Sequence, residues 1–156
     1  FNSPELVRFI EQMLASMLTA GGVGIAAPQV FCSRQIMIIA SKPNQRYPNA
    51  PQMQPLVMLN PHIKSQYGEV NLDWEGCLSV PGIRGWVPRQ QNVEVNYQDR
   101  AGKSQFIRLN GFVARIFLHE YDHLIGLSFV DRVTDSQFLV AESVWKKILS
   151  GDICHP

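Results

Sequence analysis

Apolar side chains near the start of the chain recur every three or four residues, which predicts an amphipathic helix. Ser3 is a typical N-cap residue, Pro4 suits the first helical position, and Glu5 places an acid in the first turn. Gly21 and Gly22 end the pattern. We expect this helix to pack on the core through Leu6, Phe9, Ile10, Met13, Leu14, Met17 and Leu18.

Two apolar runs without helical spacing follow, and they indicate buried strands. Residues 35–40 predict one strand. Residues 56–59 predict a second, short strand that Asn60 and Pro61 end. The intervening residues 42–55 contain four prolines, so we expect a long loop there.

The second half of the chain alternates strand and helix patterns. Residues 93–97 and 105–109 flank a turn-rich segment, which predicts an antiparallel hairpin. Asn110 is then expected to cap a helix that Gly126 ends. Asp135 is expected to cap a last helix carrying Phe138, Leu139, Val144, Trp145 and Ile148.

Composition limits the class of protein. A chain of 156 residues, 46% hydrophobic and 17% charged, predicts one globular domain, residues 1–156. A net charge of +1 argues against direct binding to nucleic acid or a membrane surface. No apolar run approaches the ~18 residues of a membrane span. Three cysteines do not form a disulfide framework, so we expect a reducing compartment.

His119, Glu120 and His123 form a His-Glu-x-x-His pattern within the predicted second helix. Positions i and i+4 lie on one helix face, so His119 and His123 can both bind one metal ion. Glu120 can then take a proton from a metal-bound water. The pattern predicts a metal-dependent hydrolase.

A catalytic metal of this kind commonly has three protein ligands, so one more is needed. Two candidates are open: Cys77, upstream, and Glu142, downstream, where thermolysin-like proteases place a glutamate. Glu75 and Gly76 beside Cys77 indicate a shaped backbone near a polar site. Two cations and an indole, Arg84, Arg89 and Trp86, follow closely.

Three stretches together resemble the signature motifs of the peptide deformylase family. They are Gly-Val-Gly-Ile-Ala-Ala-Pro-Gln at residues 22–29, Glu-Gly-Cys-Leu-Ser at 75–79 and His-Glu-Tyr-Asp-His at 119–123. They occur in the family's order and at comparable separations, and the resemblance covers nearly the whole chain. By the same resemblance, a further segment is expected before Phe1.

The resemblance implies a fold and an activity. The fold that the resemblance implies is α+β, with antiparallel β-sheets around a central helix that carries the two histidines, and with an N-terminal and a C-terminal helix. The expected reaction is hydrolysis of the N-formyl group from N-formyl-methionine of nascent polypeptides, a step of N-terminal methionine processing. Leu118 replaces a common Gln, and Gly21 replaces a common acid. These departures leave open an alternative member that removes a different small acyl group.

The resemblance also implies roles for individual residues. Cys77, His119 and His123 would bind the metal, and Glu120 would be the general base. The side-chain amide of Gln29 and the backbone N–H of Leu78 would stabilise the oxyanion. The residues expected to bind the peptide are Val23, Gly24, Gly76 and Arg84. Glu75 and Arg84 are expected to pair.

The metal ion, partners and compartment follow from the same resemblance. One divalent ion is expected, iron(II) in the cell, with zinc, nickel or cobalt able to replace it. The expected partners are the N-formyl-methionyl peptide and the ribosome. The expected location is the bacterial cytoplasm, with an organelle as the alternative.

Overall fold

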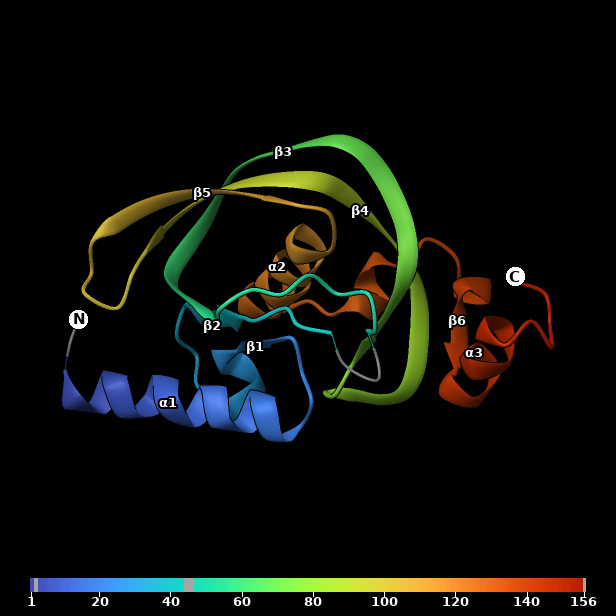
Figure 1. Cartoon of the computed structure of the whole chain (residues 1–156), viewed down its shortest axis with the longest axis horizontal. Coiled ribbons are helices and arrows are strands. Elements are labelled where there is room, and N and C mark those ends of the chain that lie inside the picture. The colour runs from blue at the N-terminus through green and yellow to red at the C-terminus, as the bar shows by residue number, and fades with distance from the viewer. Residues whose placement is uncertain (2, 44–46, 156) are drawn as a thin grey trace. The chain divides into compact units, whose positions relative to one another are not determined.

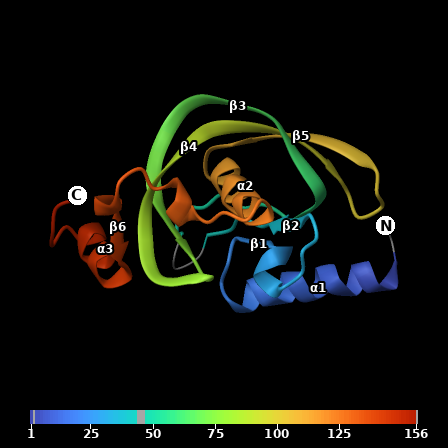
Figure 2. The same ribbon diagram turned by 180° about the vertical axis from the view of Figure 1, so that it is seen from behind.

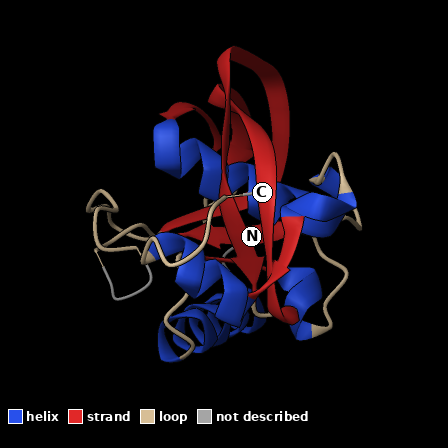
Figure 3. Cartoon of the chain, turned by 90° about the vertical axis from the view of Figure 1, so that its right-hand side faces the viewer, coloured by secondary structure: helices blue, strands red, loops and turns tan. Residues whose placement is uncertain are grey.

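A computed structural model describes residues 1, 3–43 and 47–155, in three α-helices, three short 3-10 helices and six strands (Figures 1 and 3). The helices are α1 Pro4–Thr19, α2 Gly111–Leu124 and α3 Glu142–Leu149, with η1 Ala27–Val30, η2 Phe129–Arg132 and η3 Ser136–Phe138. The strands are β1 Gly24–Ala26, β2 Ile36–Ile39, β3 Leu56–Cys77, β4 Val80–Gln98, β5 Ser104–Asn110 and β6 Leu139–Ala141. The predicted α+β class is confirmed. Within the described residues, no helix is long and apolar enough to cross a membrane.

The sheet has the strand order β1-β2-β3-β4-β5, and β6 pairs with β4. By its contacts the chain divides into two compact units. Unit 1 comprises Phe1–Glu69 and Gln90–Gly126, and unit 2 comprises Val70–Arg89 and Leu127–Pro156. The long strands β3 and β4 contribute residues to both units. That residues 1–156 form one domain stays a prediction.

Helix α1 begins and ends where the sequence predicts. The Ser3 hydroxyl accepts a hydrogen bond from the Leu6 backbone N–H at 3.2 Å, and Pro4 is the first helical residue. At the other end Gly21 adopts a φ of +66°, which a residue with a Cβ rarely tolerates. The buried face of α1 consists of Ile10, Met13 and Met17.

Strand β2 is apolar on both faces because a helix covers each face of the sheet in unit 1 (Figure 1). Ile36 and Ile38 lie in the cluster with the buried residues of α1, whereas Met37 and Ile39 lie in the cluster with α2. Successive side chains of a strand point to opposite faces, so a continuous apolar run fits a covered strand. The predicted strand at residues 35–40 is confirmed.

Helix α2 also packs against the hairpin of β4 and β5, as Figure 2 shows from behind. Val93, Val95 and Leu109 of that hairpin are buried in the same cluster as Phe117 of α2. The helix is therefore packed between β1–β2 on one side and the hairpin on the other, all within unit 1. Nine of its residues are buried, so the helix is held on most of its circumference.

The predicted hairpin at residues 93–109 is confirmed, with Val93 opposite Leu109 and Tyr97 opposite Gln105. Asp99 stabilises the turn: its carboxylate accepts hydrogen bonds from the backbone N–H groups of Ala101 and Lys103 and from the Gln105 amide. These bonds, above all the one from Gln105, lower the pKa of Asp99.

The expectation that Asn60 and Pro61 end a short strand is wrong, because β3 continues from Leu56 to Cys77. Asn60 takes a φ of +50°, a conformation that Asn tolerates better than most residues. Its backbone N–H donates to the Gln35 carbonyl at 2.7 Å, and its amide donates to Gln98 Oε1 at 2.7 Å. These two hydrogen bonds hold Asn60 where the strand passes the Asn-Pro pair.

The proline-rich segment 42–55 is a loop in the part that the structure describes, and residues 44–46 lie outside that part. The Met53 backbone N–H donates to the Ser41 carbonyl at 2.8 Å. The ring of Tyr47 lies 5.1 Å from that of Phe112. Both ends of the described loop are therefore attached to unit 1.

The prediction for the last helix is partly wrong. Asp135 does cap a turn, accepting from the Gln137 backbone N–H, but that turn is the short η3. Leu139–Ala141 then pair with β4 as strand β6, and α3 begins only at Glu142. Pairing with β4 gives residues 139–141 hydrogen-bond partners that a local helical pattern does not reveal.

Candidate active site

Helix α2 brings His119 and His123 together. Their ring centroids lie 5.1 Å apart with the planes at 84°. The Gln35 side-chain amide donates to the Leu124 carbonyl at 3.1 Å, which satisfies one carbonyl at the end of the helix. Because α2 extends to Leu124, positions 119 and 123 lie one turn apart on the same face of the helix.

Glu120 lies between the histidines in sequence and is 4% exposed. Gly24 of β1 lies directly against its side chain. A Cβ built on Gly24 would lie 2.7 Å from Cγ and 2.8 Å from Cδ of Glu120, closer than real Cβ contacts. The glycine therefore provides the space that the Glu120 carboxyl occupies.

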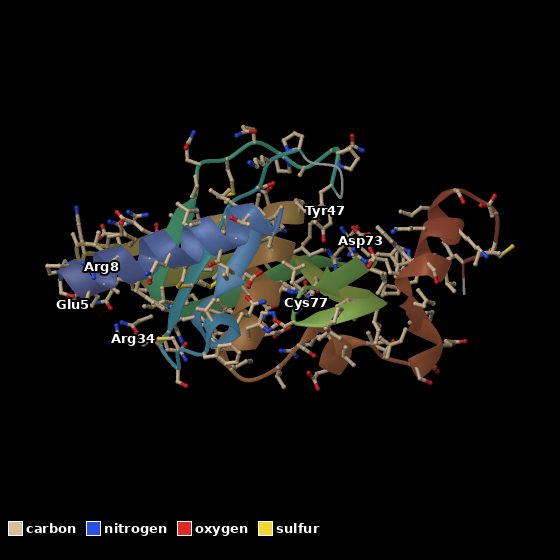
Figure 4. The ribbon with its side chains drawn as sticks, turned by 90° about the horizontal axis from the view of Figure 1, so that it is seen from below. Glu5, Arg8, Arg34, Tyr47, Asp73 and Cys77 are labelled. Carbon is tan, nitrogen blue, oxygen red and sulfur yellow. The ribbon has the colours of Figure 1, made fainter. Side chains whose placement is uncertain are left out.

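Cys77, labelled in Figure 4, is the last residue of β3 and is followed by the two-residue turn of Leu78 and Ser79. Among the described residues, the ligand atoms of Cys77, His119 and His123 all lie within 4.8 Å of one another. A thiolate and two imidazoles are a ligand set that suits zinc or iron(II). This group could therefore hold a metal ion.

The alternative third ligand, Glu142, is the first residue of α3 and has other partners. Its carboxylate lies 3.4 Å from Arg84 Nη2 and 4.0 Å from Lys146 Nζ. Of the two candidates that the sequence left open, Cys77 is the one grouped with the histidines.

Gln29 lies in η1, directly after β1. Its side-chain oxygen accepts a hydrogen bond from the Ala26 backbone N–H at 2.8 Å. Because the oxygen is used in this way, the NH₂ group is the end of the amide that can donate to a ligand. Leu78, the other expected oxyanion residue, is 54% exposed and lies in the turn after Cys77.

The expected pairing of Glu75 with Arg84 is wrong. The Glu75 carboxylate accepts two hydrogen bonds from Arg89, from Nε and Nη2, each at 3.0 Å. Both side chains of this pair are nearly buried, 5% and 6% exposed. A bidentate pair fixes both groups, so Arg89 has a structural position next to the residues that precede Cys77.

Arg84 has partners on two sides within unit 2. Toward β3, a Cβ on Gly76 would lie 2.7 Å from Cζ of Arg84, so the guanidinium lies against the Gly76 backbone. Toward α3, Arg84 pairs with Glu142 and lies 4.3 Å from the centre of the Trp145 ring. Sequence reasoning gave Trp145 only a place on an apolar helix face. The spacing of Glu142 and Trp145, three residues apart, was the available signal for a shared contact.

Three of the residues expected to contact a peptide lie at or next to strand ends, whereas Arg84 lies within β4. Val23 precedes β1, and its carbonyl accepts from the Ala40 backbone N–H at 2.7 Å. Gly24 pairs with Ile39 across β1 and β2. Gly76 is next to last in β3, and Arg84 is 4% exposed. Their contacts with substrate stay a prediction.

Known proteins resemble this chain closely. The family model described as polypeptide deformylase matches residues 1–138. Peptide deformylase 2 of Nostoc sp. is 49% identical over 143 residues, which is 92% of this chain and 80% of that protein. Peptide deformylase 2 of Shewanella oneidensis is 50% identical over 127 residues, 81% of this chain and 70% of that protein.

Solved structures agree. The class I type b peptide deformylase of Acinetobacter baumannii with bound Met-Ala-Ser has a TM-score of 0.84 at 48% identity, covering 85% of this chain and 84% of that one. A peptide deformylase of Synechococcus elongatus in complex with actinonin has a TM-score of 0.75 at 41% identity, covering 84% of this chain and 66% of that one.

An α+β fold in which one helix carries His-Glu-x-x-His, with a cysteine grouped with those histidines, defines a metal-dependent hydrolase. Within that class, the match over residues 1–138 and the relatives near 50% identity show that the chain belongs to the peptide deformylase family.

Proposed function

We propose that this chain removes the N-formyl group from N-formyl-methionine at the start of nascent polypeptides. The observation that carries the proposal is the group of Cys77, His119 and His123, with Glu120 on the same helix as the two histidines. Residues 1–156 act as one catalytic domain. The relative solved with Met-Ala-Ser supports a product that begins with methionine.

Cys77, His119 and His123 would hold the metal. Their chemistry fits, because a thiolate and two imidazoles are donors that zinc and iron(II) accept, and three protein ligands are common at a catalytic metal. A bound divalent ion supplies Lewis acidity, polarising the formyl carbonyl and making a water acidic enough to lose a proton near neutral pH. We propose iron(II) as the ion in the cell, with zinc, nickel or cobalt able to replace it.

Glu120 moves the proton. Its carboxylate accepts a proton from the water that attacks the formyl carbon, and it then gives the proton to the nitrogen of the leaving amine. The C–N bond breaks, formate leaves, and the peptide keeps a free N-terminus. Burial and the contact with Gly24 limit the positions that this carboxylate can take.

Gln29 and Leu78 stabilise the charge that develops on the formyl oxygen. The Gln29 NH₂ is the donor, since the amide oxygen is held by the Ala26 N–H. The Leu78 backbone N–H is the second donor. One such preorganised donor is worth about 3 kcal/mol of transition-state stabilisation in enzymes where it has been removed.

The peptide binds along backbone that is already extended. Val23 and Gly24 lie at the start of β1 and Gly76 at the end of β3, so these residues offer backbone groups to a peptide added as a strand. Arg84 is the further candidate for substrate binding. The ribosome, where nascent chains emerge, is the proposed partner, and the bacterial cytoplasm is the proposed location.

The test is hydrolysis of a formyl-Met tripeptide by anaerobically purified protein, compared with Glu120→Ala, with metal content measured on both. Removing a general base should slow turnover by about 10²–10⁴-fold while the variant keeps its metal. A fully metallated wild-type protein without turnover would overturn the proposal.

Two rival readings are tested alongside. A panel of formyl, acetyl and longer acyl peptides separates a deformylase from a relative that removes another small acyl group, which Leu118 and Gly21 suggested. Cys77→Ser should abolish metal binding and Glu142→Ala should not. The reverse result would favour a protease-like site that uses Glu142.

A further inference from the structure

The three residues that precede Cys77 are each contacted by a side chain of β4. Trp74 lies against Trp86, with ring centroids 5.1 Å apart. Glu75 is paired with Arg89, and Gly76 lies against Arg84. We call these three contacts the β4 brace. It fixes the end of β3 from which the proposed metal ligand extends.

Residues 139–155, which comprise β6, α3 and the segment after it, also contact the residues of the β4 brace. Strand β6 pairs with β4 at the brace, with Val140 opposite Arg84. Helix α3 then provides Glu142 and Trp145, which contact the Arg84 guanidinium by an ion pair at 3.4 Å and a ring contact at 4.3 Å. His155 lies 4.3 Å from the Trp86 ring, centroid to centroid.

These outer contacts come from residues beyond the part of the chain that the family model matches, which ends at residue 138. Arg84 itself lies within the matched part. The guanidinium is therefore held by groups that lie outside the matched residues. Its burial, at 4% exposure, leaves few other positions for it.

We infer that Glu142 and Trp145 of α3 are positioning residues for the metal ligand Cys77. They act through Arg84, which presses on the backbone of Gly76, the residue joined to Cys77. The inference rests on the proposed role of Cys77 as a ligand.

The physical reason is the cost of moving an arginine that is fixed on both sides. When a guanidinium contacts both an indole ring and a carboxylate, both its position and the orientation of its plane are fixed. With Glu142 or Trp145 removed, the guanidinium can turn away and Gly76 gains freedom. The Sγ of Cys77 then samples positions farther from the histidines, and a metal ion leaves faster.

The experiment measures metal release from the full chain loaded with Zn²⁺, in excess chromogenic chelator and without peptide. Glu142→Gln and Trp145→Leu should each release Zn²⁺ about tenfold faster than wild type, as for other partners outside a ligand shell. Lys147→Gln is the matched control, because it removes a charge from an exposed side chain of the same helix, one that is not among the Arg84 and Glu142 contacts described above. It should release Zn²⁺ at the wild-type rate.

Equal release rates in wild type, Glu142→Gln and Trp145→Leu would overturn the inference. Should Trp145→Leu unfold, Glu142→Gln decides alone, since it keeps the size of a side chain that is 37% exposed. The role of Arg84 as the intermediary is tested in an Arg84→Gln variant, in which adding Glu142→Gln should not increase the rate of Zn²⁺ release further. An added acceleration there would overturn the route through Arg84.

The premise is tested separately. Co²⁺-loaded protein should show a thiolate-to-metal charge-transfer band that Cys77→Ser abolishes. A missing band would count against the proposed metal site, whereas an intact band with unchanged release in the α3 variants would count only against the positioning role.

Discussion

Helix α2 and the end of β3 supply ligands to the same proposed metal, yet they hold those ligands in different ways. His119 and His123 are placed by the regular hydrogen bonds of a helix, and the Glu120 carboxyl occupies space that Gly24 leaves. Cys77 stands at a strand end, where the residues before it are held by long side chains of β4.

The difference shows how the two elements depend on the rest of the chain. The backbone hydrogen bonds of a helix fix the positions of its own residues, so a substitution on a neighbouring element acts on the helix by crowding one of its side chains. The end of a strand has no hydrogen bonds within itself, so a substitution of a residue that contacts Arg84 can change the position of Cys77. Substitutions of the two kinds should therefore separate catalysis from metal retention and stability.

The largest effect is expected for Glu75→Gln. It leaves the nearly buried Arg89 guanidinium without its carboxylate, and removing one partner of a buried pair costs about 3–5 kcal/mol. Denaturant unfolding measures the loss. The double variant Glu75→Leu/Arg89→Met, which removes both charges, should recover much of it. A loss below 1 kcal/mol would mean that β4 does not hold this strand end through the pair.

Gly24→Ala should come next, and it should act on turnover rather than on metal. The new methyl displaces the Glu120 carboxyl, and a displacement of ~1 Å can cost about 100-fold in rate. Formyl-peptide kinetics and metal analysis check this. Gly22→Ala is the control, since its Cβ would lie 3.3 Å from Met17 Cγ, where the side chain can give way.

A double variant identifies the cause of the Gly24→Ala defect. Glu120→Asp shortens the acid and makes room for the methyl, so Gly24→Ala should cost less in the Asp background than in wild type. Additive losses would instead assign Gly24 to peptide binding alone.

Gly76→Ala should produce a smaller loss, of about 1–3 kcal/mol in unfolding free energy, because its methyl forces the Arg84 guanidinium to move. Zn²⁺ release should also accelerate. A variant that loses turnover but retains zinc as wild type does would contradict the contrast drawn between the two glycines.

The smallest effect is expected at an exposed ion pair in the unit 1 part of β4. Hydrogen bonds from Arg108, whose side chain is 70% exposed, and from Ser65 lower the pKa of Glu94. A lowered pKa in the folded state stabilises the protein above the ordinary pKa, and that stability is lost as the pH falls through the folded value. Glu94→Gln should therefore be slightly less stable than wild type at pH 7. The difference should shrink as the pH falls below the ordinary pKa of a glutamate and vanish only below the lowered pKa of the folded state, as measured by thermal unfolding across pH.

Local chemistry made much of the fold predictable. Ser3 and Pro4 predicted the start of the first helix, the apolar run at 35–40 predicted a buried strand, and Gly126 predicted the end of α2. In each case the residues that decide the structure lie within a few positions of one another. The pattern at 119–123 likewise depends only on helical spacing.

Long-range partners were not predictable. Asn60 continues a strand because its left-handed conformation is supported by Gln35 and Gln98. The choice of Arg89 rather than Arg84 as the partner of Glu75 depends on the register of two long strands. A sequence presents both arginines as equal candidates, whereas a one-residue change of register decides which side chain faces the carboxylate.

The hydrogen bond between Ala26 and Gln29 has a consequence for how the protein ages. Slow hydrolysis of the Gln29 amide to a carboxylate would preserve an oxygen that accepts from the Ala26 N–H, so the local backbone would remain as it is. The lost NH₂ is the group proposed to face the reacting oxygen, and a negative charge would replace it. Old molecules would then stay folded and metallated while losing activity, and a mass increase of about one dalton together with one added negative charge would distinguish them.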